Sequence, residues 1–496
     1  MEPSDTAPPD PAPTGNEKNR RRPPDLTTGP IPRGLLVFTL PMLGANLLQS
    51  LNGTANAAWV SHILGPAALT ATANANNILF LLLGAVFGLA MAANLLIAQA
   101  VGAGATAEIK RVAGASTLFF ALLSLAVGLA GLALAPAILA AMGTPDDARA
   151  DAVIYLRVIF AALPFMYFFS FVMMAMRGTG DSRTPFYFSL TAVALDIILN
   201  PVLILGLGPV PTLGIGGSAA ATLLSQTIAL TGMIVFLYRT GSPLVLRRGE
   251  WGLLRPDPAI LKTLVFKGLP MAMHMLVVSG AAVVMLAFVN AYGSQTAAAY
   301  AAAMQVWTYV QMPAMALGAA VSSMAAQNVG AGRMDRVEHV ARTGVLFALV
   351  MTALPIGLIY LAEPLILRIF LPEGSASIPI ARHINSIALW GFIPFGVAFI
   401  FAGVVRATGA VIAPLLAMVV SLWVVRIPFV QLMTPVLGSD AIWWSFPLGS
   451  ITTVILAGGY YIWGGWRGST LAPPPRGAVA DTGQATPAMA PLARGD

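Results

Sequence analysis

Long apolar runs separated by short polar or basic connectors dominate the pattern along this chain. The stretches 34–107 and 268–332 contain no Asp, Glu, Lys or Arg, and each is long enough for two helices of about 20 apolar residues that cross a membrane. The runs are continuous rather than alternating, which disfavours barrel strands. The pattern predicts twelve transmembrane helices, at approximately 35–57, 67–97, 114–141, 153–176, 185–207, 217–238, 264–290, 297–322, 343–362, 384–405, 412–433 and 441–463.

The composition agrees with a membrane protein. Hydrophobic residues make up 57% of the 496 positions and charged residues only 9%, which no soluble globular protein matches. The ends differ, because residues 1–32 are rich in Pro, Asp, Thr and Arg and residues 468–496 in Ala, Pro and Gly, so we expect both to be disordered tails. The first apolar run begins too late and is too long for a cleavable signal peptide. The absence of Cys excludes disulfides and thiolate metal sites.

The placement of basic residues predicts the orientation in the membrane. With the N-terminus in the cytoplasm, the connectors on that side carry most of the Lys and Arg, whereas the opposite connectors mix a few Arg with Asp and Glu. The net charge of +7 is therefore assigned to orientation and not to nucleic-acid binding. We expect a multi-pass protein of the plasma (inner) membrane that has both termini in the cytoplasm and acts as a monomer.

The chain contains an internal duplication. AQAVGAG at 98–104 returns as AQNVGAG at 326–332, so Gln99 and Gln327 are 228 positions apart. Leu-Pro-Met at 40–42 returns at 269–271, and RGTGDSRTP at 177–185 matches RATGAVIAP at 406–414, both 229 positions on. One register over most of both halves indicates a repeat. It predicts an N-lobe at 33–239, a cytoplasmic linker at 240–262 and a C-lobe at 263–467.

The number of spans in each half decides how the halves are related. Six is even, so both halves enter the membrane from the same side and an axis along the membrane normal relates them, as in transporters built from parallel repeats. The alternative is a larger bundle without transport. Prolines within or near the ends of spans weigh against it, because each frees a carbonyl that must be packed or face a cavity. We expect an all-α integral membrane protein with 12 transmembrane helices in two parallel six-helix repeats.

Asp196 is the only charged residue between Arg183 and Arg239. It lies near the middle of a predicted span, so it should be protonated, neutralised by a cation or exposed to a water-filled cavity. Asn200 lies on the same helix face, and Pro201 frees a carbonyl beside them. These groups are a candidate site for a proton or a monovalent cation, Na⁺ included. The alternative is a permanently protonated acid that hydrogen-bonds neighbouring helices.

Other polar residues in the spans are accessory candidates. His274 can titrate near neutral pH or remain a neutral hydrogen-bonding residue. Arg426 corresponds in the repeat to Ile197, beside Asp196, and is expected to snorkel or to pair with backbone carbonyls. Polar residues of the first two spans either face a cleft or join helices; they are Gln49, Asn52, Asn56 and the run from Ala71 to Asn77.

Several segments together resemble the multidrug and toxic compound extrusion (MATE) family. They are LPMLGANLLQSLNGTANAAWVSHILG, RGTGDSRTP, NPVLILGLGP and the paired AQ-x-VGAG, and the resemblance covers nearly everything between the tails. The pattern is nearest the bacterial DinF-like and NorM-like members. The resemblance implies a twelve-helix fold of two lobes, shared with the wider MOP superfamily, and export of cationic or amphiphilic compounds against a proton or sodium gradient.

The chain departs from the family pattern at its carboxylates. Many members carry an Asp fifteen residues after the Leu-Pro proline, where this chain has Asn56. In the fifth helix the usual order is Asn and then Asp, whereas here Asp196 precedes Asn200. The carboxylate has moved by one helical turn, about 5.4 Å. The resemblance therefore implies that coupling depends on Asp196, Asn200 and Asn56.

These observations predict a secondary active antiporter for small cationic or amphiphilic compounds, with H⁺ or Na⁺ as its coupling ion and no other cofactor or resident metal. H⁺ is favoured because Na⁺ normally takes several oxygen ligands. A flippase for lipid-linked precursors, the alternative within the superfamily, would need basic residues in the cleft, and only Arg426 qualifies. A channel suits kinked, duplicated lobes less well. An enzyme is disfavoured because no span offers a His/Glu zinc pair and no Walker A lysine follows a glycine.

Overall fold

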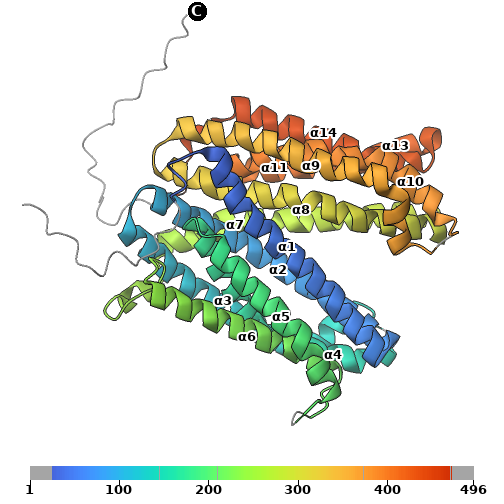
Figure 1. Cartoon of the computed structure of the whole chain (residues 1–496), viewed down its shortest axis with the longest axis horizontal. Helices are drawn as coiled ribbons and strands as arrows, with labels where there is room; N and C mark the ends of the chain where they lie inside the picture. Colours follow the sequence, from blue (N-terminus) through green and yellow to red (C-terminus); the bar gives the residue numbers. More distant parts are fainter. Residues whose placement is uncertain (1–24, 145, 209–210, 373, 470, 472–496) are drawn as a thin grey trace, which may run out of the picture.

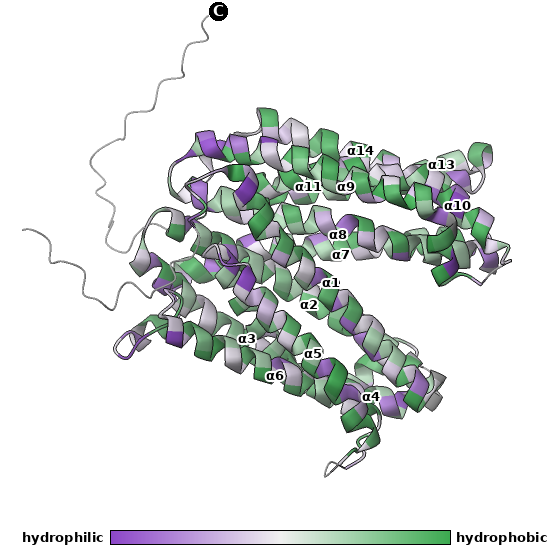
Figure 2. Ribbon diagram, viewed as in Figure 1, coloured by the Kyte–Doolittle hydropathy of each residue, from purple (hydrophilic) through white to green (hydrophobic). Residues whose placement is uncertain are grey.

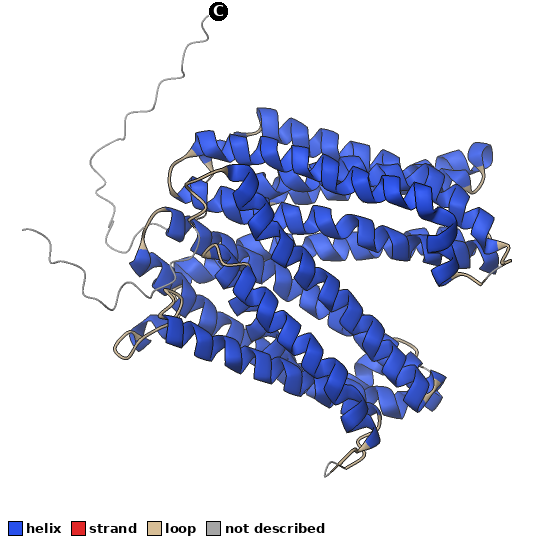
Figure 3. Cartoon of the chain, in the orientation of Figure 1, coloured by secondary structure: helices blue, strands red, loops and turns tan. Residues whose placement is uncertain are grey.

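The computed structural model describes residues 25–469 and 471, apart from residues 145, 209–210 and 373, and these residues form helices and connectors without strands (Figure 3). The first half contains α1 (Ile31–Leu64), α2 (Pro66–Gly102), α3 (Thr106–Ala141), α4 (Asp146–Gly178), α5 (Arg183–Leu205) and α6 (Ile215–Thr240). The second contains α7 (Pro258–Asn290), α8 (Ser294–Gly330), α9 (Met334–Phe370), α10 (Ser377–Ala388), α11 (Phe392–Ala407), α12 (Ile412–Val419), α13 (Ile427–Leu437) and α14 (Asp440–Trp463). Short helical turns are η2 (Trp251–Leu254), η3 (Leu389–Gly391), η4 (Val420–Arg426) and η5 (Gly465–Gly468).

Twelve membrane-length segments are present among the described residues. α10, η3 and α11 form one continuous segment, and α12, η4 and α13 form another. Eleven segments are long and apolar enough to cross a membrane, and α8 is the twelfth, with 37 residues and no charged side chain. Its many Ala, amide and hydroxyl groups lower its hydropathy, and much of it is buried in protein. Hydrophobic residues prevail along the helices (Figure 2), and many large ones are exposed, as a lipid-facing surface requires.

The helices form two lobes that lie together at one end and diverge toward the other (Figure 1). α1 packs against α8, α7 packs against α2, and α2 packs against α8. The first helix of each half therefore contacts the second helix of the other half. This reciprocal arrangement is the one expected of a duplicated sequence whose halves are related by a twofold axis.

The repeated phrase holds the lobes together where they meet. Gln99 of α2 donates through Nε2 to the backbone oxygen of Ala407, at the end of α11, over 2.7 Å. Gln327 of α8 makes the equivalent contact with the backbone oxygen of Gly178, at the end of α4, over 2.8 Å. Each glutamine thus crosses from its own lobe to satisfy a helix-end carbonyl of the other lobe. We call this region the joined end.

The glycines of the phrase allow the two helices to approach. A Cβ atom added to Gly102 would lie 1.8 Å from the carbonyl oxygen of Gln327, and one added to Gly330 would lie 1.9 Å from the carbonyl oxygen of Gln99. Small residues permit such backbone contact between membrane helices. The phrase occurs twice because each copy supplies one half of a symmetric contact.

The predicted boundaries need correction at the N-terminal start of each lobe. Disorder was expected as far as residue 32, but Leu26 is buried, its N–H donates to Gln327 Oε1, and its carbonyl accepts from Asn328 Nδ2. The buried leucine side chain and its backbone hydrogen bonds hold this segment against α8, and α1 follows at Ile31. The linker expected to end at 262 gives way to α7 at Pro258, which Asp257 caps by accepting from the Ala259 N–H. Residues 1–24 and 472–496 of the expected tails lie outside the described residues.

Candidate functional site

Asp196 of α5 is only 2% exposed and connects three helices of the N-lobe. Its Oδ2 accepts a hydrogen bond from Asn52 Nδ2 of α1 at 2.9 Å. Its Oδ1 accepts one from Thr222 Oγ1 of α6 at 3.1 Å. Both donors are neutral, and Asp196 forms no ion pair within the part of the chain that the structure describes. A carboxylate in this setting can exchange a proton or bind a small cation without first breaking a salt bridge.

Asn200 provides unused hydrogen-bonding capacity one turn after Asp196. It is 1% exposed, and neither its Oδ1 nor its Nδ2 has a partner among the described residues. The Oδ1 of Asn52 is likewise buried without a partner there. Buried polar atoms are nearly always satisfied, by water or a ligand where not by protein. The carboxylate and the two amide oxygens are therefore the groups that could hold a proton carrier or a monovalent cation.

Asn56 lies one turn beyond Asn52 on α1 and contacts a different partner. Its Oδ1 accepts a hydrogen bond from Ser218 Oγ of α6 at 2.7 Å. Asn52, and not Asn56, is thus the α1 residue that donates to Asp196. Asn56 still borders the site, because Ser218 and Thr222 are one turn apart on α6 and Thr222 reaches the carboxylate.

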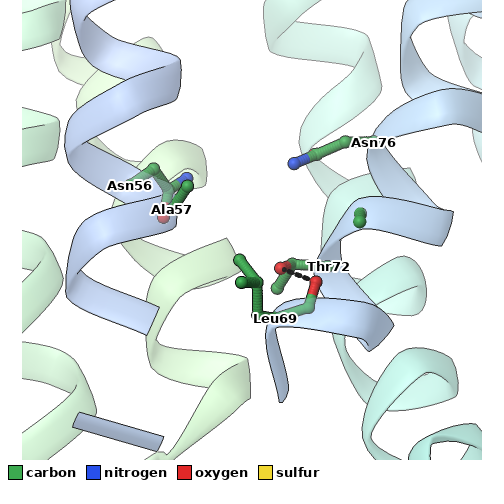
Figure 4. A pocket seen from close by; sticks show the side chains of 6 residues that line it. Asn56, Ala57, Leu69, Thr72 and Asn76 are labelled. Carbon is green, nitrogen blue, oxygen red and sulfur yellow. Dashed lines mark hydrogen bonds between the residues drawn. The ribbon is translucent and has the colours of Figure 1, made fainter. Parts of the chain in front are cut away.

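A small pocket extends the site toward α2. It has a volume of about 120 Å³ and lies between α1 and α2, with Asn56 facing Thr72 and Asn76 across it (Figure 4). The Tyr155 hydroxyl of α4 donates to Asn76 Oδ1 at 3.4 Å. The predicted polar run from Ala71 to Asn77 therefore contributes to this pocket through Thr72 and Asn76. Its lining residues are Asn56, Ala57, Leu69, Thr72, Ala73 and Asn76.

The other sequence candidates lie apart from Asp196. Gln49 and Asn77 are exposed on α1 and α2. His274 belongs to α7, where its ring meets the Phe399 ring edge-on, with 6.1 Å between centroids. Arg426 belongs to η4 of the C-lobe. Neither ionisable candidate shares a hydrogen bond with the Asp196 cluster in the described structure.

Sequence reasoning missed the contributions of α4 and α6. Thr222 and Ser218 are spaced four residues apart, which places them on one helix face. That spacing was visible, but hydroxyl residues are common in membrane helices and usually bond to their own backbone. Nothing in the sequence marked Tyr155 as a site residue, because it is simply an aromatic residue near the end of a predicted helix. Only the packing of α4 against α2 and of α6 against α5 selects these residues.

The C-lobe contains a second buried carboxylate, which lies just outside the predicted spans. Glu363 lies within α9 and not in a connector, and it is 8% exposed. Its Oε2 accepts from Arg382 Nε at 3.5 Å, and its Oε1 accepts from Asn385 Nδ2 at 3.3 Å. Asn385 Oδ1 in turn accepts from the Trp307 indole at 3.0 Å. The charge of Glu363 is thus balanced by a neighbour, unlike that of Asp196.

The chain matches a known family and several named proteins. The MatE family model matches it twice, over residues 41–202 and 270–432, in the register of the internal repeat. The probable multidrug resistance protein YoeA of Bacillus subtilis (strain 168) is 35% identical over 431 residues, which cover 86% of this chain and 93% of YoeA. The probable multidrug resistance protein YpnP of the same organism is 31% identical over 453 residues, 90% of this chain and 98% of YpnP. The multidrug export protein MepA of Staphylococcus aureus (strain MRSA252) is 25% identical, covering 84% and 90% of the two chains.

Solved structures show the same fold. A crystal structure of MATE in the bent conformation superposes with a TM-score of 0.81 at 20% identity, over 88% of this chain and 96% of that one. An outward-facing multidrug resistance MATE transporter of the MOP superfamily gives a TM-score of 0.80 at 20% identity, with the same coverage. With the double family match, these similarities show that the chain is not an enzyme but belongs to the MATE family of multidrug efflux transporters.

Proposed function

We propose that this protein exports cationic or amphiphilic organic compounds in exchange for H⁺, and that Asp196 is the coupling carboxylate. The observation that carries the proposal is the setting of Asp196, which is buried, has two neutral donors and forms no ion pair among the described residues. Ionisable residues inside membrane spans are expensive and commonly functional. The relative MepA is named a multidrug export protein, and YoeA and YpnP are named probable multidrug resistance proteins, which supports efflux.

The hydrogen bonds of the site suit both protonation states. Asn52 and Thr222 donate to the ionised carboxylate, while the unpaired amide oxygens of Asn52 and Asn200 can accept from its protonated form. In the outward-facing state Asp196 takes a proton and releases the exported compound. In the inward-facing state it loses the proton and favours a new cation. A proton and a cationic compound thus compete for one negative charge, which is the minimum that antiport requires.

The same contacts favour H⁺ over Na⁺ as the coupling ion. Both oxygens of Asp196 already accept a hydrogen bond, and within the described structure no second carboxylate is hydrogen-bonded into the cluster. Na⁺ would have to share these oxygens and recruit the Asn52 and Asn200 amides. A proton needs one oxygen and leaves the cluster in place. A flippase for lipid-linked precursors gains no support from the N-lobe site, which offers no basic group.

The orientation forms part of the proposal. The joined end carries the loops that begin with Gly102, Gly178, Gly330 and Ala407, and basic residues follow each of the first three. The positive-inside rule places such loops in the cytoplasm. We therefore place both termini in the cytoplasm and the diverging ends of the lobes outside. The proposal takes the monomer as the unit of transport.

Transport by the purified full chain in sealed vesicles tests this function. A pH gradient and a Na⁺ gradient are imposed separately, and movement of a fluorescent organic cation is followed. We expect the pH gradient alone to drive accumulation in the direction opposite to proton flow. Accumulation driven by Na⁺ but not by H⁺ would overturn the coupling ion, and accumulation driven by neither would overturn antiport.

A further inference from the structure

Arg426 ends a distorted turn in the eleventh membrane segment. The seven residues Val420–Arg426 form a π-helical turn between α12 and α13. Pro428 follows two residues later and cannot donate to the carbonyl of Val424, which removes one ordinary helix bond. π-helical turns within α-helices occur frequently at functional sites. The turn aims the Arg426 side chain into the C-lobe, where it is only 8% exposed.

The guanidinium of Arg426 has fewer partners than its burial requires. Its Nε donates to Ser445 Oγ of α14 at 3.2 Å. Its Nη2 is fully buried and has no hydrogen-bond partner among the described residues, and no carboxylate there forms an ion pair with it. Arginine stays charged in proteins, so it cannot avoid this cost by losing its proton. An acceptor that is not part of the described chain would complete the site.

Two other arginines of the spans, the buried Arg177 and the partly buried Arg406, have a stabilising neighbour that Arg426 lacks. Arg177 and Arg406 each lie in the last turn of their helices, α4 and α11. The carbonyls and dipole of a helix C-terminus stabilise a cation at that position. Arg426 has no such helix end beside it, because α13 continues directly from η4. Its missing partner therefore needs a different explanation.

The surroundings of Arg426 are aromatic. Its guanidinium carbon lies 3.5 Å from the centroid of the Phe446 ring. The Trp307 ring meets Phe446 at 4.7 Å and the Tyr300 ring meets it at 6.2 Å, measured between centroids. Stacking on a ring fixes the plane of the guanidinium and leaves its edge free for two parallel hydrogen bonds. Such an edge suits a carboxylate, sulfate or phosphate group, and the rings suit an apolar chain attached to it.

We propose that Arg426, with Ser445 and the ring of Phe446, binds the anionic head group of an amphiphile within the C-lobe. In the repeat, Arg426 corresponds to Ile197, which adjoins Asp196. The two lobes therefore carry opposite charges at positions that are adjacent, not identical, in the repeat, a carboxylate for a proton or cation in one and a guanidinium for an anion in the other. The inference does not depend on the antiport proposal, because it concerns binding without any gradient.

Equilibrium binding to the purified full chain in neutral detergent tests the proposal. The probes are octanoate, octanol and acetate, and the readout is the intrinsic tryptophan fluorescence, to which Trp307 contributes. We expect octanoate to bind more tightly than octanol by about tenfold or more, the usual effect of a hydrogen bond to a charged group. Acetate should bind more weakly than octanoate because it lacks the apolar chain. Displacement of octanoate by phosphatidylglycerol would identify a lipid head group as the source of the anion, and failure to displace it a soluble amphiphile.

Substitutions localise the effect. Arg426→Gln should abolish the preference for octanoate over octanol, and Arg426→Lys should keep part of it. The control is Arg382→Gln, which removes a half-exposed arginine of the same lobe that already pairs with Glu363, and it should keep the full preference. Equal binding of octanoate and octanol to the unmodified protein would overturn the proposal, even if Arg426→Gln fails to fold. So would a preference that survives in Arg426→Gln or disappears equally in Arg382→Gln.

Discussion

Asn52 donates a hydrogen bond to Asp196 over 2.9 Å and so connects α1 to α5, the first and fifth helices of the N-lobe. Asn56, one turn further along α1, is bonded to Ser218 instead. The two asparagines therefore differ in their contacts, because only Asn52 is hydrogen-bonded to the carboxylate. A comparison of the two separates a direct effect on Asp196 from a general change in the polarity of α1.

We predict that Asn52→Ala moves the pH dependence of transport toward higher pH. Loss of a hydrogen bond to the ionised carboxylate makes that form less favourable, typically by about 1.5–3 kcal/mol, and the proton is held more tightly. The midpoint of pH-dependent efflux is measured in vesicles. Asn56→Ala is the matched control and should move the midpoint much less. Equal movement in both variants would show that the Asn52 contact has no special role.

The close approach of α2 and α8 predicts a strict need for glycine at Gly102. Gly102→Ala places a methyl group against the Gln327 carbonyl and forces the helices apart, at a cost of about 1–3 kcal/mol. The measurement is the Tm of the purified protein. Gly357→Ala in α9 is the control, because nothing lies within 4 Å of its added Cβ, and it should be neutral or stabilising. A Gly102→Ala variant as stable as Gly357→Ala would contradict the joined end.

The linker before α7 provides a pH-dependent contact outside the membrane spans. Burial alone would raise the pKa of Asp257, but the hydrogen bond and charge of Arg111, at 2.7 Å, hold that pKa below its usual value of 3.8. The contribution to stability is therefore complete above about pH 5 and is lost as the pH falls through the lowered pKa. We predict that Asp257→Asn lowers the Tm near neutral pH, and that its difference from the unmodified protein shrinks toward about pH 3.

The control for Asp257 is an ion pair of the same kind on the surface. Glu338 and Arg467 are 3.1 Å apart and both more than two-fifths exposed, and such pairs contribute about 0–1 kcal/mol. Glu338→Gln should leave the Tm nearly unchanged across the same pH range. A constant Tm difference for Asp257→Asn at every pH would mean that its ionisation is not what stabilises the linker.

The proposed orientation can be tested because the chain has no native cysteine. Ala103 and Ala331 occupy equivalent positions beside the joined end and have ordinary helical backbone angles. Each is followed by a glycine with a left-handed backbone conformation, where a side chain would be strained. The variants Ala103→Cys and Ala331→Cys avoid that strain. We predict that a membrane-impermeant maleimide labels both only from the cytoplasmic side. Labelling of either from outside in intact cells would reverse the topology.

The helices and their pairing into repeats were predictable because each apolar run is long enough to span and the motifs keep one register. Their ends were not, because polar turns continue the helices beyond the membrane. α9, for example, begins at Met334 and not near residue 343. The order at Leu26 was hidden for a related reason. The sequence of a polar segment does not reveal that its single leucine packs against α8, because that contact depends on the tertiary structure.

Asp196 was predictable as a lone charge in an apolar run, and Asn200 followed from helical spacing. Which of Asn52 and Asn56 contacts Asp196 was not predictable from the sequence. Both lie on one face of α1, and only the position of α1 along its axis relative to α5 decides which of them meets the carboxylate. The family pattern suggested Asn56, because relatives carry an acid at that position. In this structure the α1 partner of Asp196 is Asn52, one turn before Asn56. The roles of His274 and Arg426 in transport stay predictions.

The most direct test of the coupling role of Asp196 is efflux by the Asp196→Asn variant in energised vesicles. The substitution is nearly isosteric and keeps hydrogen-bonding capacity, so the protein should insert and keep a Tm close to that of the unmodified chain. It removes the ionisation, so we predict that efflux of a fluorescent organic cation driven by a pH gradient falls to background. Binding of that cation should weaken as well, because the amide resembles the protonated acid. Efflux at the unmodified rate would contradict a coupling role for Asp196 and leave it as a structural residue.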